Sequence, residues 1–156
     1  MRHPRRAARR YLRGLGAVVL TVAQHRHVIV TGAFGVLGAA VARRFAAEGA
    51  RVGLIDRAAV PHDVRRAYGG GHQVRGEVDL SDEPAATAAI AELAAGLGGL
   101  DVLVNVAGGF QWQPLAEGSV AAWESMFTMN LKTAVVACRA ALPLMLVRGG
   151  GRIIAK

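Results

Sequence analysis

Apolar residues are distributed along this chain in two alternating patterns. Short apolar runs occur at 28–30, 51–55 and 102–106, and longer segments with apolar residues at helical spacing follow them. Short apolar runs are typical of strands that are covered on both faces, and the alternation of strands with helices indicates a parallel sheet. We therefore predict one α/β domain over residues 27–156, with a doubly wound parallel sheet.

The bounds of the predicted elements follow from these runs and from the residues between them. Ser81 is a suitable N-cap because acidic residues follow it in the first turn, and the glycines at 96–99 end that helix. We expect strands at 28–30, 51–55, 72–78, 101–106 and 151–154, and helices at 35–48, from Ser81 to the glycines at 96–99, and at 123–147.

The first strand runs directly into a glycine-rich loop that opens a helix. Gly32, Gly35 and Gly38 stand where a tight turn, a close backbone approach to a pyrophosphate and close helix packing each exclude a Cβ atom. The N–H groups at the start of the following helix would then face the phosphates. The spacing predicts a Rossmann-like dinucleotide-binding unit.

An acidic residue, Asp56, ends the second strand. It follows the glycines by about 20 residues, where a carboxylate binds the ribose hydroxyls of NAD and repels the additional phosphate of NADP. We therefore predict NAD as the cofactor. NADP is the less favoured alternative because Arg57 lies beside Asp56, and a strand end in plain solvent is the other interpretation of Asp56.

Three motifs together resemble the short-chain dehydrogenase/reductase family over residues 27–155. Thr31-Gly32 and the later glycines are similar to the family's cofactor loop, Asn105-Val106-Ala107-Gly108 to its Asn-Asn-Ala-Gly signature, and Asn130 to the catalytic-helix asparagine that holds a water for the active-site lysine. The resemblance implies strand order 3-2-1-4-5 and hydride transfer between NAD(P) and an alcohol or carbonyl compound. It implies that Asp79 meets the adenine ring, and that the cofactor site comprises Thr31, Gly32, Gly35, Val36, Leu37, Gly38, Asp56, Asp79, Leu80, Asn105, Ala107 and Gly108.

The chain also departs from the family pattern. Val36 stands where the ordinary branch has a glycine, and Val106 replaces the second asparagine of the signature. The family's chemistry needs a serine after the fifth strand and a Tyr-x-x-x-Lys helix, in which the tyrosine exchanges a proton while hydride moves. Neither Tyr11 nor Tyr68 has a lysine four residues later, and Lys156 is interpreted as a solvated terminal charge. We expect a domain truncated after the fifth strand and inactive by itself; a non-catalytic module that binds a nucleotide or a partner is the alternative.

The segment 123–147 is apolar around nearly its whole helical circumference. A helix of this kind is buried on several sides, and in the family it packs on the sheet and on a second subunit. We expect a second copy or another partner to contact it. The apolar residues at helical spacing are Trp123, Met126, Phe127, Leu131, Ala134, Val135, Cys138, Leu142 and Met145.

The charge of the chain is concentrated at its amino terminus. The net charge is +8, and residues 1–26 hold seven arginines and no acidic residue. We favour a disordered, solvated extension. A twin-arginine-type export signal at residues 9–23 is the first alternative to a cytoplasmic protein, although its apolar run is too short to span a bilayer. Nucleic-acid binding is disfavoured because aromatic residues do not alternate with the arginines.

The remaining candidate residues add little chemistry. Cys138 is the only cysteine and is predicted to be a small buried hydrophobe. The histidines lack acids or cysteines at ligand spacing, so no metal site is predicted. In the family, Phe110-Gln111-Trp112 would lie near the substrate, and an aromatic anchor for a loop is an equally good interpretation.

Overall fold

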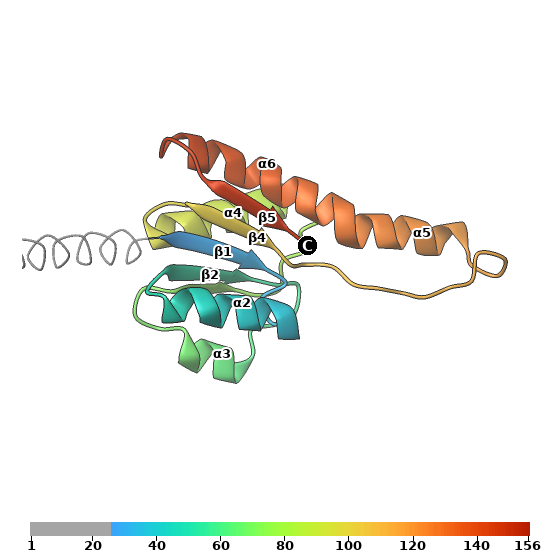
Figure 1. The fold of residues 1–156 in the computed structure, drawn as a ribbon, viewed down its shortest axis with the longest axis horizontal. Helices are drawn as coiled ribbons and strands as arrows, with labels where there is room; N and C mark the ends of the chain where they lie inside the picture. The colour runs from blue at the N-terminus through green and yellow to red at the C-terminus, as the bar shows by residue number, and fades with distance from the viewer. Residues whose placement is uncertain (1–25) are drawn as a thin grey trace, which may run out of the picture.

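A computed structural model describes residues 26–156, which form five parallel strands and the helices that cover them (Figure 1). The strand order is β3-β2-β1-β4-β5, as predicted. The strands are β1 (His27–Thr31), β2 (Arg51–Ile55), β3 (Gln73–Arg75), β4 (Val102–Asn105) and β5 (Arg152–Ala155). The predicted basic extension at 1–26 and the export-signal alternative at 9–23 lie outside the described residues, apart from Arg26.

Two apolar clusters hold the sheet between its helices. Alternate residues of a strand point to opposite faces, so Ile29 of β1 packs with α4 (Glu83–Leu97) and α6 (Thr133–Leu146), while Val28 and Val30 pack toward α2 (Val36–Ala47). These core residues of β1 are fully buried. A doubly wound α/β sheet is therefore present, as the sequence predicted.

Several predicted boundaries were wrong. The N-cap of α4 is Asp82 and not Ser81, because the Asp82 side chain accepts a hydrogen bond from the Ala85 amide at 3.1 Å. The third strand ends at Arg75 because Glu77 takes a left-handed conformation, with φ of 61°. A short helix that the apolar pattern did not indicate, α3 (His62–Ala67), follows β2.

The long apolar segment forms α5 (Val120–Phe127), a π-helical turn η1 (Thr128–Lys132) and α6 in direct succession. Figure 1 shows α5 projecting beyond the end of the sheet, and α5 contains no buried residue. The inward side of α6 consists mainly of small residues such as Ala137, Ala140 and Ala141, which allow close packing on α4 and β4.

Large apolar residues of this segment face away from the sheet and are exposed in the single chain. We call them the outer stripe: Val120, Trp123, Phe127, Leu131, Val135, Leu142 and Leu146. Within the described residues, the stretch Val120–Leu146 has the length and composition of a membrane span. Core helices of soluble proteins pass the same test. Because α6 packs on α4, we interpret the α6 part of this stretch as a core helix with one exposed side.

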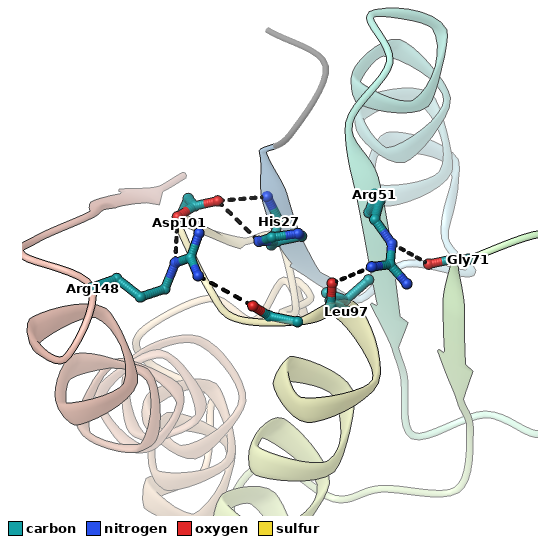
Figure 2. A network of polar contacts seen from close by, with 7 residues as sticks. His27, Arg51, Gly71, Leu97, Asp101 and Arg148 are labelled. Carbon is teal, nitrogen blue, oxygen red and sulfur yellow. Dashed lines mark hydrogen bonds and ion pairs between the residues drawn. The ribbon is translucent and has the colours of Figure 1, made fainter. Parts of the chain in front are cut away.

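A polar network ties the elements together at the edge of the sheet where β1 and β4 begin (Figure 2). Asp101 accepts hydrogen bonds from the His27 amide at 2.8 Å and from the Arg148 Nε at 2.8 Å, so one carboxylate joins β1, the start of β4 and the end of α6. Arg51 donates to the carbonyls of Gly71 at 3.0 Å and Leu97 at 2.6 Å. This network lies at the opposite edge of the sheet from the cavity described next.

Candidate active site

A cavity of about 990 Å³ lies beyond the carboxyl ends of the parallel strands. It spans the point where the strand order reverses, between β1 and β4, which is where doubly wound sheets bind their ligands. Ten of the predicted site residues line it: Gly32, Gly35, Val36, Leu37, Gly38, Asp56, Asp79, Leu80, Ala107 and Gly108. Thr31, Asn105 and Asn130 do not line it.

A glycine stands at each of the three loop positions for a different structural reason. Gly32 has a φ of 62°, and a Cβ there would lie 2.8 Å from the Ala107 Cα. A Cβ on Gly38 would overlap the Gly32 carbonyl oxygen. A Cβ on Gly35 would meet only that same oxygen, at an ordinary 3.5 Å, so its missing side chain leaves space in the cavity and not in the protein core.

The first turn of α2 is open to the cavity. Gly35 is the N-cap and makes no side-chain cap hydrogen bond, and Val36 is 93% exposed. The first N–H groups of a helix have no intrahelical acceptor, and the helix dipole adds partial positive charge there. This end of α2 is therefore suited to a phosphate or another anion.

Thr31 acts on the backbone of the neighbouring loop. Its side chain is fully buried, and its Oγ1 accepts hydrogen bonds from the amides of Val106 at 3.1 Å and Ala107 at 3.0 Å. The hydroxyl thus joins the end of β1 to the loop after β4. Thr31 positions two cavity walls without facing the cavity.

Two carboxylates, those of Asp56 and Asp79, line the cavity. Asp56 accepts hydrogen bonds from the Phe34 amide at 2.9 Å and the Ala58 amide at 3.0 Å, so its side chain is held between the glycine loop and the end of β2. The Ser81 amide, at 2.8 Å, and the Ser81 hydroxyl lower the pKa of Asp79. Arg57 also lines the cavity.

Asn105 is buried at the carboxyl end of β4. It is 4% exposed, its Nδ2 donates to the Cys138 Sγ at 3.3 Å, and among the described residues its Oδ1 has no hydrogen-bond partner. Its backbone carbonyl accepts the amide of Lys156 at 3.3 Å. Cys138 is only half-buried, and it serves as an acceptor in addition to packing against the core.

Asn130 lies in the π-helical turn η1 and holds the loop after β4. Its Oδ1 accepts the Gly109 amide at 3.1 Å, and its Nδ2 donates to the carbonyls of Gly109 at 3.0 Å and Met126 at 2.9 Å. The side chain therefore fixes both polar groups of Gly109. π-Helical turns often occur at functional sites, and this one places Asn130 against a cavity wall.

Several residues that line the cavity were not predicted. Lys156, interpreted from the sequence as a solvated terminal charge, is exposed but lines the cavity. One face of α5 and η1 also lines it, through Ala121, Glu124, Ser125, Thr128 and Met129. Small and polar residues recur there at spacings of three and four within an otherwise apolar helix, a signal that could have revealed this face.

Comparison with known proteins agrees with this geometry. A sequence model of the family described as short chain dehydrogenase matches residues 26–155. The chain belongs to the short-chain dehydrogenase/reductase family. The match confirms the family resemblance seen in the sequence. Members of this family are oxidoreductases and generally bind NAD(P).

Individual relatives of this short-chain dehydrogenase/reductase are similar over about 130 residues. D-threitol dehydrogenase from Mycolicibacterium smegmatis is 36% identical over 81% of this chain and 50% of its own length. Cis-4-hydroxycyclohexanecarboxylate dehydrogenase from Sinomonas cyclohexanicum is 38% identical over 83% of this chain and 53% of its own length. The chain thus spans about half the length of these curated relatives.

A solved structure shows the same fold. A protein from Burkholderia xenovorans that is described as a short-chain dehydrogenase/reductase superposes with a TM-score of 0.74 and 33% identity, and covers 85% of this chain and 56% of its own.

Proposed function

We propose that residues 27–156 form the NAD-binding portion of an oxidoreductase that interconverts alcohols and carbonyl compounds. The observation that carries the proposal is the cavity that joins the uncapped start of α2 to the Asp56 carboxylate. Gly35 fits a dinucleotide because the absence of a Cβ leaves room in the cavity. Packing within the protein does not require a glycine at this position. The bound nicotinamide would supply hydride transfer.

The chain's own residues divide the work of binding. The N–H groups at the start of α2 would face the pyrophosphate, and Asp56, anchored by two backbone amides, would accept hydrogen bonds from the ribose hydroxyls. Asp79 and Leu80 would flank the adenine ring. Thr31 and Asn130 position the walls, so the role proposed for Asn130 is to hold Gly109 beside the reacting end.

The cofactor is proposed to be NAD rather than NADP. The Asp56 carboxylate would repel a 2′-phosphate, whereas Arg57, which lines the same cavity, would attract one. Calorimetric titration of both cofactors against the chain tests this, with Asp56→Ala and Arg57→Ala as variants. We expect NAD to bind more tightly than NADP. Asp56→Ala should weaken NAD by about 10- to 100-fold, since a hydrogen bond to a charged group contributes about 1.5–3 kcal/mol. Arg57→Ala should leave NAD binding unchanged. Tighter binding of NADP, or binding of neither, would refute the proposal.

The 156-residue chain by itself is proposed not to turn over alcohols. It contains no Tyr-x-x-x-Lys sequence to exchange the proton that accompanies hydride transfer. Steady-state assays with NAD and a panel of secondary alcohols test this, and enzyme-like rates for the purified chain would contradict it.

We place the protein in the cytoplasm, with export through residues 9–23 as the alternative.

A second role is supported by the outer stripe. Seven large apolar side chains are exposed along one side of α5, η1 and α6, and exposed apolar patches of this kind mark interaction surfaces. We propose that this side contacts a second copy of the chain. A module that binds a partner without catalysis would use the same side.

A further inference from the structure

Phe110 is an aromatic residue that lines the cavity but is not packed into the protein. Its side chain is 80% exposed. A phenylalanine that serves only to anchor a loop would bury its ring, because burial of such a side chain contributes about 1.5–3 kcal/mol. The anchor interpretation therefore does not describe this ring.

The backbone on both sides of Phe110 is fixed to the helix that lines the cavity. Before it, the amide and carbonyl of Gly109 bond to the side chain of Asn130 at 3.1 and 3.0 Å. After it, the amide of Gln111 donates to the Sδ of Met126 at 3.3 Å. Residue 110 is thus held between two attachments to α5 and η1, and the ring is presented to the cavity by an ordered backbone.

The neighbouring aromatic residue differs in one respect. Trp112 is also exposed, at 73%, but it does not line the cavity. The walls that share the cavity with Phe110 include Glu124, Ser125 and Thr128, which offer a carboxylate and two hydroxyl groups. The cavity therefore combines one flat apolar ring with several hydrogen-bonding groups, which suits a ligand that has an apolar face and a hydroxyl group.

We propose that Phe110 determines substrate class by stacking on the ring of a small cyclic alcohol or cyclic ketone. The inference rests on the proposed function, because the substrate must share the cavity with the dinucleotide. A saturated ring presents a face of C–H groups that covers a phenyl ring more completely than an acyclic chain of the same carbon number. The hydroxyl groups and the carboxylate on α5 and η1 remain available for the polar end of the ligand.

Saturation-transfer NMR with the full 156-residue chain tests this proposal. Cyclohexanol is titrated against the wild-type chain, Phe110→Ala and Phe110→Tyr, with Trp112→Ala as the matched exposed aromatic control and 3-hexanol as the acyclic ligand. We expect cyclohexanol to bind more tightly than 3-hexanol, and Phe110→Ala to weaken cyclohexanol about tenfold, because the variant loses the apolar surface that the ligand covers. Phe110→Tyr and Trp112→Ala should bind as the wild type does.

The proposal is overturned if Phe110→Ala binds cyclohexanol as the wild type does, or if 3-hexanol binds equally well. Each titration is run with and without NAD, and NAD affinity is measured separately for every variant and should not change. Absence of NAD binding to the wild type would refute the proposed function. The comparison of Phe110→Ala with the wild type in the absence of NAD would still decide the role of the ring.

Discussion

At the scale of single residues, the loop glycines show that one motif combines two different physical requirements. A side chain at position 38 would collide with the backbone of its own loop, whereas a side chain at position 35 would enter the cavity. Gly38→Ala should lower the free energy of unfolding by about 1–3 kcal/mol, the usual cost of overpacking. Gly35→Ala should change it by less than about 1 kcal/mol but abolish most NAD binding, because the new methyl group occupies the path of the pyrophosphate.

Urea unfolding and NAD calorimetry on the two variants separate these effects. The expected result is a crossed pattern, with one variant unstable and the other stable but defective in binding. If Gly35→Ala binds NAD as well as the wild type does, the dinucleotide does not pass over this loop. If Gly38→Ala is as stable as the wild type, the backbone of the loop has more freedom than the structure shows.

Roles of single residues were harder to predict than their identities. The motifs singled out Thr31 and Asn130 as site residues, yet both side chains bond to the loop after β4 and do not line the cavity. A motif records that a residue type stands at a position. It does not record which backbone group a short polar side chain will reach once two loops are brought together, since that depends on contacts 76 and 21 residues away in sequence.

At the scale of elements, the Asp101 network should control how firmly α6 is attached to the sheet. Burial alone would raise the pKa of the Asp101 carboxyl, but the His27 amide and the Arg148 guanidinium outweigh it and lower that pKa. A lowered folded pKa means that the stabilisation is complete above the unfolded pKa of about 4 and is lost as the pH falls through the folded pKa. We expect Asp101→Asn to lower the free energy of unfolding at pH 7 by about 1–2 kcal/mol.

Urea unfolding between pH 7 and pH 2.5 checks this prediction, with Glu117→Gln as a control in an exposed loop. The difference between wild type and Asp101→Asn should be constant from pH 7 to about pH 5 and should shrink below about pH 4. The control should differ little from the wild type throughout. A difference that persists unchanged at pH 2.5 would show that the carboxylate charge is not what joins β1, β4 and α6.

The positions of β1, β2 and β4 were predictable because continuous burial leaves a clear apolar signal, whereas the strand order was predicted from the family resemblance. The bounds of β3 and α4 were not predictable, because they depend on a left-handed residue, Glu77, and on which of two adjacent polar residues reaches the Ala85 amide. The sequence did not indicate which face of the long helix packs on the sheet, because the segment is apolar around nearly its whole circumference. The core side of α6 consists mainly of small residues such as Ala137, Ala140 and Ala141, which favour close packing on α4, while larger residues such as Leu142 and Leu146 face outward.

At the scale of the whole molecule, the outer stripe is a row of exposed apolar side chains that runs the length of α5, η1 and α6. Seven side chains, each between 47% and 74% exposed, repeat at spacings of three, four and seven residues, as on a single helix face. Domains have only about 5–15 kcal/mol of net stability, and burial contributes about 25 cal/mol per Å². Pairing of two such stripes would therefore add substantially to the stability of each copy.

Leu131→Lys tests whether a second copy covers this stripe. It places a charge at the middle of the stripe and leaves the core intact, because Leu131 is 51% exposed. Ala40→Lys adds the same charge at an exposed position of α2, on the other side of the sheet. In sedimentation velocity we expect the wild type and Ala40→Lys to form dimers as concentration rises to about 100 μM, a range typical of weak association, and Leu131→Lys to remain monomeric. Dimers that persist in Leu131→Lys would place the interface elsewhere, and a wild type that stays monomeric would leave the stripe to a different protein.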